Sequence, residues 1–279
     1  MSYNVRLYEY AESRQIRIYS KTIGTDKEEN ENEKTETYEN TEQHEKDNYT
    51  ITSPFDGTEL LNVEFEDYLK FKESKRKRSQ SVSMNRSKQN IYELARANKW
   101  EYFITLTFDR NKIDSSDYDS LVKQVGKWFN NVKSRKAPNL KYMIVPELHK
   151  DGIHYHFHGL LANCDGLSIV DSGVVQDGKT VYNLTDFKYG FTTATKVQDT
   201  NKVSSYICKY ITKELETVLK GKRRYIASRN CDRPQIIEYN LTDDEIKDML
   251  DSVTPDVTHM KTQQFAEFGQ SVRYIELKR

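Results

Sequence analysis

The sequence has few cysteines, no long apolar run and no excess of either sign of charge. Its 279 residues include three cysteines without a Cys-x-x-Cys pair, which argues against a disulfide framework and a thiolate zinc site and predicts a reducing environment. No apolar stretch approaches the ~20 residues that a membrane-spanning helix needs. The opening residues, MSYNVRLYEY, lack the basic start and apolar core of a secretory signal. We therefore expect a soluble, cytoplasmic protein with no membrane partner.

The balance of 43 basic and 43 acidic residues conceals a separation of charge along the chain. Residues 26–47 hold ten acidic side chains and three lysines, a net charge of −7, and this composition predicts disorder. Residues 70–88 hold eight basic side chains and one acidic, net +7, and residues 196–233 hold ten and four, net +6. Two basic segments favour a polyanion partner, because each neutralised phosphate releases counterions. The alternative is a solvated surface without a partner.

Local patterns divide the chain into five segments. We predict an N-terminal β-hairpin over residues 1–22, an acidic disordered linker over 23–50, a basic segment with a short helix over 51–95, a main folded domain over 96–235 and a C-terminal extension over 236–279. The short helix begins near Asn90, after the basic stretch. No role is assigned to either end of the chain.

The main domain is expected to have an α+β fold. Apolar residues spaced as on one helix face predict a helix over 116–133, and a second helix is expected from about 201 to 219. Alternating or β-branched runs predict strands over 102–108, 141–148 and 153–162, a hairpin over 168–184 and a strand within 187–197. This order predicts an antiparallel sheet of about five strands with helices packed on it.

One motif is set aside as a turn. Residues 173–180 read GVVQDGKT and match the phosphate-loop pattern GxxxxGK[ST]. That loop binds phosphate only where a helix follows it, whereas the residues that follow here have a strand pattern. Asp177-Gly178 is a strong hairpin turn, so we predict a hairpin and no nucleotide hydrolysis.

Four of the six histidines fall within ten residues, namely His149, His154, His156 and His158. Residues two apart in a strand share a face, so the last three are expected to point the same way. Glu147 lies on the neighbouring predicted strand. Two imidazoles and a carboxylate would suit a divalent metal, whereas histidines that are merely exposed or hydrogen-bonded are the alternative.

A second cluster lies on the predicted helix after residue 200. In KVSSYICKYITKEL, Tyr206 and Tyr210 share one face, one turn apart, and Lys209 and Lys213 lie beside them. A phenol can attack phosphorus and retain the phosphoryl group, while cations hold phosphates and lower the phenol pKa. Packing is the alternative role for such a pair, since the chain has 19 tyrosines.

The two clusters together resemble one family. HYHFHGLL resembles both the His-apolar-His motif of HUH endonucleases and the histidine repeat of histidine-triad nucleotide hydrolases. ITLTF, HFH and YICKYITK follow the order of elements in HUH rolling-circle replication initiators, over about residues 101–229. Two tyrosines in that helix resemble the form found in initiators of small single-stranded DNA phages and related plasmids. We therefore expect residues 96–235 to form an HUH, RRM-like endonuclease domain.

The resemblance implies a role for each matching residue. His156 and His158 match the histidine pair because GLL follows them, and Glu147 matches the third ligand, so together they would hold Mn²⁺ or Mg²⁺. His154 is then an extra histidine, although a pair formed by His154 and His156 is an alternative register. Tyr206 and Tyr210 would be nucleophiles. Lys209 and Lys213 would position phosphates.

The expected function is initiation of rolling-circle replication. The protein would nick single-stranded origin DNA, form a 5′-phosphotyrosine and a free 3′-OH, and later rejoin the strands. The sequence shows no helicase domain, so a host helicase and a polymerase are expected partners. Alternatives are a histidine-triad nucleotide hydrolase or transferase, a DNA-binding regulator that lost the chemistry, and a transposase or conjugative relaxase with the same parts.

Overall fold

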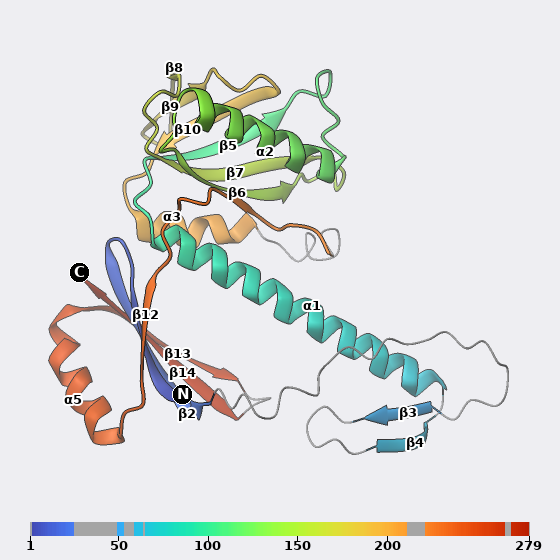
Figure 1. Ribbon diagram of the computed structural model, residues 1–279, viewed down its shortest axis with the longest axis vertical. Coiled ribbons are helices and arrows are strands. Elements are labelled where there is room, and N and C mark those ends of the chain that lie inside the picture. The colour runs from blue at the N-terminus through green and yellow to red at the C-terminus, as the bar shows by residue number, and fades with distance from the viewer. Residues whose placement is uncertain are drawn as a thin grey trace. The chain divides into compact units, whose positions relative to one another are not determined.

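The computed structural model describes residues 2–24, 49–52, 59–63, 65–210, 221–265 and 269–278 (Figure 1). The chain forms two compact units, one of Met1–Thr25 with Ser87–Arg279 and one of Asp26–Arg86. Among the described helices, none combines the length and the apolar character needed to cross a bilayer. The fold is α+β, as predicted, with antiparallel sheets and helices.

A seven-stranded antiparallel sheet forms the centre of the first unit. Its strands, in spatial order, are β11 (Ile226–Ala227), β6 (Lys141–Leu148), β7 (Tyr155–Ala162), β5 (Tyr102–Phe108), β10 (Gly190–Lys196), β9 (Lys179–Leu184) and β8 (Ile169–Gln176). The sheet exceeds the predicted five strands because the β8–β9 hairpin extends one edge and the two-residue β11 adds to the other.

Helix α2 (Tyr118–Arg135) covers one face of this sheet (Figure 1). Asp117 caps its N-terminus by accepting the backbone N–H of Ser120. The predicted apolar stripe is buried, and Phe129 and Leu121 are fully enclosed. This stripe packs with the inward residues of the central strands, such as Ile104 and Phe157, to form the main hydrophobic core. Burial of these large side chains is the main source of stability in this layer.

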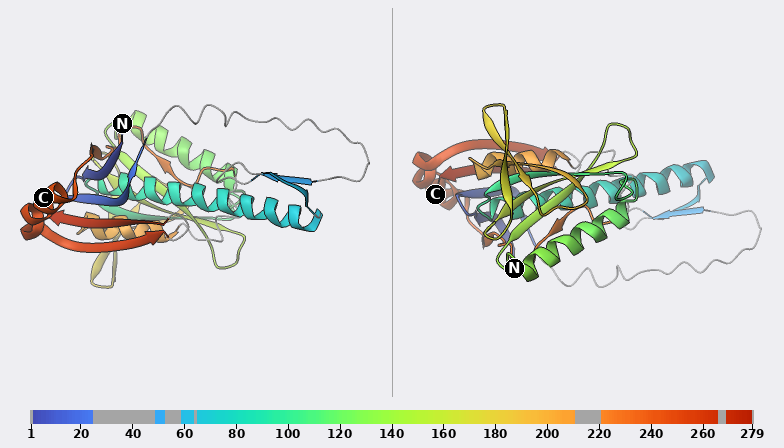
Figure 2. Two further views of the ribbon diagram at one scale, coloured as in Figure 1. Left: turned by 90° about the horizontal axis from the view of Figure 1, so that it is seen from below. Right: turned by 90° about the horizontal axis from the view of Figure 1, so that it is seen from above.

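Strand alternation places the opposite set of side chains on the face away from α2. On β5, Ile104 and Leu106 are buried in the core, whereas Thr105 and Thr107 point to the other face. The predicted turn at Asp177-Gly178 is confirmed, and both residues have positive φ, 49° and 73°, as a type I′ turn requires. The β6–β7 and β8–β9 hairpin tips project on the side of the sheet away from α2 (Figure 2).

The two ends of the chain pair in a second antiparallel sheet. The predicted N-terminal hairpin is present as β1 (Tyr3–Glu9) and β2 (Ser13–Ile23). It pairs with β12 (Gln235–Tyr239) on one side and with β14 (Gln270–Lys278) on the other, and β13 (Val257–Phe265) follows β14. Helix α5 (Asp243–Val253) packs apolar side chains against the Val5, Ile16 and Ile275 cluster.

Helix α1 (Phe65–Arg96) is much longer than the short helix predicted near Asn90. It includes the whole basic stretch, because residues 65–96 contain no glycine or proline and are rich in strong helix formers. Seven of the eight basic side chains in 70–88 are exposed. The second unit also contains the short pair β3 (Tyr49–Thr52) and β4 (Glu59–Val63). Residues 25–48, most of the predicted acidic linker, lie outside the described residues.

Candidate active site

The predicted metal ligands lie on the face of the seven-stranded sheet away from α2. His156 on β7 is directly opposite Glu147 on β6, and His158 is opposite Val145. On the other side of β7, His158 is opposite Thr105 of β5. Directly opposed residues project to the same face. Glu147, His156 and His158 therefore share one surface, as the sequence predicts.

His158 is the most enclosed polar side chain of this face, with 7% of its surface exposed. Its Nε2 lies 2.6 Å from Oε2 of Glu147 and its Nδ1 lies 3.0 Å from Oγ1 of Thr105. Burial lowers the pKa of His158, although Glu147 works in the opposite direction. A neutral imidazole has one N–H, so Nε2–H donates to the Glu147 carboxylate while Nδ1 accepts from the Thr105 hydroxyl.

The remaining histidines separate into two groups. The rings of His149 and His156 stack with centroids 5.0 Å apart, and burial together with His149 lowers the pKa of His156. His154 does not join the row, because β7 begins at Tyr155 rather than at 153 as predicted. Asp151 accepts the backbone N–H of His154, and its carboxylate lies 2.7 Å from Nδ1 of that histidine. This turn binds His154 before the strand begins.

The donor set of the histidine face fits a divalent ion in chemistry and in placement on the strands. Two imidazoles and one carboxylate on adjacent strands leave positions for substrate oxygens. In the part of the chain that the structure describes, however, no three His, Cys, Asp or Glu side chains converge as a metal site. The Glu147–His158 hydrogen bond explains why, since a proton lies between these two donors. Metal binding requires that hydrogen bond to open.

Helix α3 (Thr200–Ile207) and the 3₁₀ turn η1 (Cys208–Tyr210) carry the two predicted nucleophiles. Asp199 caps α3 by accepting the backbone N–H of Lys202. Ile207 is fully buried, which turns the neighbouring tyrosines toward the sheet edge. The predicted helix over 201–219 is thus observed as far as Tyr210, and residues 211–220, with Lys213, lie outside the described residues.

The two tyrosines meet each other and the histidine face. The Tyr210 ring stacks on the His158 ring with centroids 3.6 Å apart and an interplanar angle of 15°. The Tyr210 hydroxyl donates to the Tyr206 hydroxyl at 2.9 Å. Phe103 of β5 packs against both tyrosine rings, at 5.4 Å and 6.1 Å. The structure therefore joins the two clusters, which are separated by about 50 residues in sequence, at one point.

Tyr206 and Tyr210 have different environments. Burial, the hydrogen bond to Tyr206 and the charge of Glu147 raise the pKa of Tyr210. Tyr206 is 45% exposed, and the Lys209 ammonium lies 5.5 Å from its ring centroid. Tyr206 also accepts the hydrogen bond from Tyr210, an interaction that favours its phenolate. These features make Tyr206 the more accessible of the two phenols.

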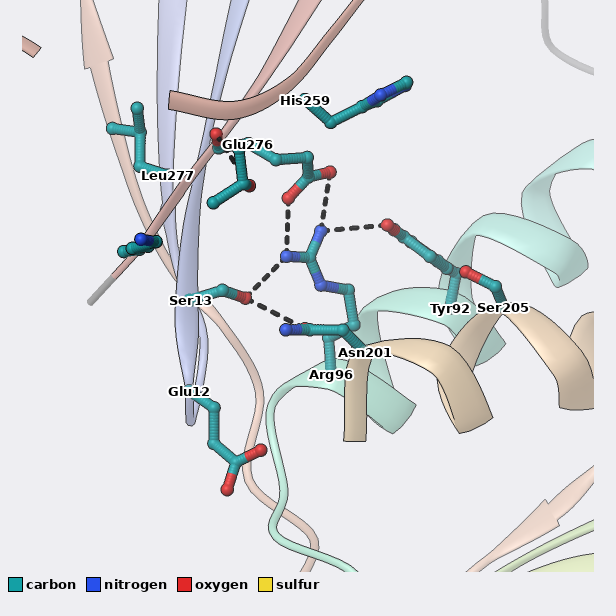
Figure 3. Close-up of a pocket in the computed structure, with 11 residues that line it drawn as sticks. Glu12, Ser13, Tyr92, Arg96, Asn201, Ser205, His259, Glu276 and Leu277 are labelled. Atoms are coloured by element: carbon teal, nitrogen blue, oxygen red, sulfur yellow. Dashed lines mark hydrogen bonds and ion pairs between the residues drawn. The ribbon is translucent and has the colours of Figure 1, made fainter. Parts of the chain in front are cut away.

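A buried polar network holds α3 against the end of α1 and the second sheet (Figure 3). Arg96, 3% exposed, donates to both carboxylate oxygens of Glu276, at 2.6 Å and 2.9 Å, and to Tyr92. It also donates to Ser13, whose hydroxyl donates to Asn201 of α3 at 3.1 Å. The N- and C-terminal strands thus reach the tyrosine helix through Asn201.

A cavity of about 740 Å³ opens beside the tyrosine pair. It lies between α3, the face of β5 and β10 that carries Thr105 and Thr193, and the tip of the β8–β9 hairpin. Three lysines line it, Lys179, Lys196 and Lys202, together with Asp177 and Asp199. Such a cavity is large enough for part of an extended nucleotide chain.

The sequence analysis did not identify Thr105, Phe103 or His149 as site residues. A signal existed for the first two, because alternation in YFITLTF places both on the face opposite Ile104 and Leu106. His149 follows the end of β6, and the turn that brings it to His156 has no sequence signature. Side-chain contacts of this kind depend on strand register.

Comparison with known proteins points to DNA replication. Residues 101–215 match a family model described as replication-associated protein ORF2. The match covers less than half of the chain, from the start of β5 through α3, and includes every predicted site residue. No curated protein and no solved structure matches the chain. The chain is therefore similar to replication-associated proteins, which supports a role in the initiation of replication.

Proposed function

We propose that this protein nicks single-stranded origin DNA by tyrosine attack and rejoins the strands after rolling-circle replication. One observation carries the proposal: the hydrogen-bonded Tyr206–Tyr210 pair stacks on His158, which is itself bonded to Glu147 and Thr105. A nucleophile pair beside a histidine-carboxylate face is what phosphodiester transfer requires. The family match over residues 101–215 supports the same function.

In the proposed reaction, the Tyr206 oxygen attacks the scissile phosphorus and loses its proton to solvent. A bond forms between that oxygen and phosphorus while the bond from phosphorus to the 3′ oxygen breaks. The products are a 5′-phosphotyrosine and a 3′ oxygen that takes a proton from water. Lys209 lies beside the Tyr206 ring, where its charge offsets the charge that develops on the phosphate. Lys213 would have a similar role.

Glu147, His156 and His158 would hold a divalent ion that polarises the phosphate as a Lewis acid. Two imidazole nitrogens suit Mn²⁺ better than Mg²⁺, which takes oxygen ligands. Thr105 supports this role, because its hydroxyl can accept Nδ1–H once Nε2 of His158 is engaged. The chain's own residues thereby orient the imidazole in both states.

The second tyrosine allows the strands to be rejoined. After Tyr206 is esterified, Tyr210 can attack the newly made origin, and the free 3′-OH of the displaced strand then attacks the Tyr206 ester. Each transfer forms one phosphate ester as it breaks another, so no external energy source is needed. A polymerase would extend the 3′-OH, and a host helicase would unwind the duplex.

The alternatives differ in how they use these residues. A histidine-triad hydrolase needs a free imidazole as nucleophile, but both nitrogens of His158 are hydrogen-bonded and Tyr210 covers its ring. A DNA-binding regulator that lost the chemistry is the second candidate. It is favoured by the finding that no three metal donors converge among the described residues.

Covalent product formation tests the proposal. The protein is incubated with Mn²⁺ and labelled single-stranded oligonucleotides that tile the DNA around its own gene, and adducts are separated on a denaturing gel. The Tyr206→Phe, Tyr210→Phe double variant is the matched control, since it removes two hydroxyls and keeps both rings. An adduct with the wild type alone supports the nickase. DNA binding without any adduct supports the regulator.

A further inference from the structure

Phe191 on β10 is an aromatic side chain that the fold leaves uncovered. With 73% of its surface exposed, it is the most exposed aromatic side chain in the described part of the chain. Its neighbours Thr192 and Ala194 are buried on the α2 side, so Phe191 lies on the histidine face. A single exposed apolar residue is ordinary on a protein surface. Its position in the sheet is what gives this one a role.

Strand register places Phe191 in one row with the candidate metal ligands. It is opposite Thr107 of β5, which is opposite His156 of β7, which is opposite Glu147 of β6. Adjacent strands lie about 5 Å apart, so the Phe191 backbone is about 10 Å from that of His156. This separation brings a base next to the scissile phosphate within reach of the ring.

The lysine-lined cavity lies two residues further along the same strand. Thr193 and Thr195 follow Phe191 on the same face of β10 and line the cavity with Lys179 and Lys196. Hydroxyls and ammonium groups are common ligands of DNA phosphates. Asp199 is engaged in capping α3, which leaves Asp177 as the other carboxylate of the lining. The hairpin tips that project on this side border the same face (Figure 2).

We infer that Phe191 and the lysine-lined cavity form a track for single-stranded DNA across β10, with a base beside the nick stacked on Phe191. This inference rests on the proposed function, because it assigns the substrate path of the same site. Stacking requires an unpaired base whose face is open, so the track selects single strands over duplex. Stacking on an aromatic ring accepts any base, so sequence recognition at this position is weak.

Abasic substitution combined with mutation tests the track. Affinity for a single-stranded oligonucleotide that forms the adduct is measured by fluorescence anisotropy with wild type and Phe191→Ala. The same oligonucleotide is then made with one abasic site at each position in turn. Phe191→Ala should weaken binding roughly 5- to 100-fold, the effect of losing one stacked base. The abasic site that weakens wild-type binding by a similar factor should have little effect on the variant.

Two control variants separate stacking from other effects. Phe191→Tyr keeps the ring and should bind like wild type. Val170→Ala removes an exposed apolar side chain, 51% exposed, from the same sheet outside the cavity, and should also bind like wild type. Circular dichroism melts should be unchanged for all three variants, since neither side chain is buried.

The outcomes distinguish the track from the nickase activity. Unchanged affinity in Phe191→Ala, with the adduct still formed, overturns the track and leaves the proposed function in place. Binding by the wild type without an adduct on any oligonucleotide overturns the proposed function, and the track is then judged by the same affinities on the oligonucleotide that binds best. Absence of any binding to single strands overturns both.

Discussion

The hydroxyls of Tyr206 and Tyr210 are chemically unequal although the sequence motif around them is the same. Tyr210 donates its hydrogen to Tyr206, and burial raises the pKa of Tyr210. Tyr206 receives that hydrogen bond and is nearly half exposed. A hydrogen bond received at a phenol oxygen stabilises the phenolate, which is the form that attacks phosphorus. We therefore assign the first attack to Tyr206 and the second to Tyr210.

Single and double tyrosine substitutions test this order. Tyr210→Phe should retain nicking and adduct formation, whereas Tyr206→Phe should form adduct more slowly but detectably, because Tyr210 contacts the same histidine face. Neither single variant should complete strand transfer, which needs a second nucleophile while the first is esterified. The double variant should form no adduct. Mass spectrometry of the trapped peptide identifies the tyrosine, and a label on neither residue would end the hypothesis.

The histidine face allows a second residue-scale prediction about metal. Chelation should abolish adduct formation and leave DNA affinity largely unchanged, since affinity depends mainly on phosphate electrostatics. His156→Ala should have the same effect. His154→Ala is the matched control and should retain most activity, because His154 is bound to Asp151 in the preceding turn. Equal loss from His154→Ala and His158→Ala would show that the ligand register is His154 with His156.

At the scale of elements, α3 depends on packing because it has only eight residues. Helices of this length are not stable alone in water. Ile207 anchors its inner face, and the chain of contacts from Arg96 through Ser13 to Asn201 fixes its start. The ends of the protein therefore hold the nucleophile helix in place, although they lie outside the family match.

Removal of the Arg96 guanidinium tests this support. Arg96→Met leaves the Glu276 carboxylate without its partner, and we expect a loss of about 3–5 kcal/mol in the free energy of unfolding, measured with urea. The double variant Arg96→Met, Glu276→Met should recover much of that loss, because no unpaired charge remains. Arg6→Met breaks an exposed pair with Glu238 in the same sheet and should lose less than about 1 kcal/mol. Similar losses from Arg96→Met and Arg6→Met would contradict a supporting role.

The elements that sequence could predict are those defined by local periodicity. The apolar stripe of α2 and the alternation in 102–108 and 141–148 reproduce the observed elements almost to the residue. The second sheet could not be predicted, since β2 and β14 are about 250 residues apart and pairing leaves no local signal. The length of α1 was missed because its helix-forming residues are mostly charged and show no apolar stripe.

The same distinction holds for the candidate site. Spacing within one strand predicts that His156 and His158 share a face with Glu147, as they do. Spacing cannot show that Tyr210 stacks on His158, because that contact depends on how α3 packs against the sheet. Nor can it show that the Glu147–His158 hydrogen bond takes the place where a metal would bind. Tertiary packing decides both features.

At the scale of the whole molecule, the chain is neutral but its charges are sorted. The net charge of −7 in residues 26–47 is equal and opposite to the net charge of +7 in residues 70–88. Basic residues of 70–88 are exposed along α1, where no described apolar partner covers them. Acidic side chains elsewhere in the same chain compete with DNA phosphates for such cations. The neutral total therefore understates the affinity that the basic segments can provide.

Deletion of residues 26–47 tests whether that competition matters. The product has a net charge of +7 and should bind single-stranded DNA more tightly than the full chain at low salt, with the difference shrinking as salt screens the charges. A variant with a Gly/Ser segment of the same length in place of 26–47 separates charge from chain length and should bind like the deletion. Replacing Lys75, Arg76, Lys77 and Arg78 by Gln in the deletion background should lower the slope of log K against log salt by up to about 3, since each single-strand phosphate contact contributes about 0.7. If affinity across a salt titration is the same with and without residues 26–47, the acidic segment serves only as a spacer, and the basic residues of α1 bind DNA without competition from it.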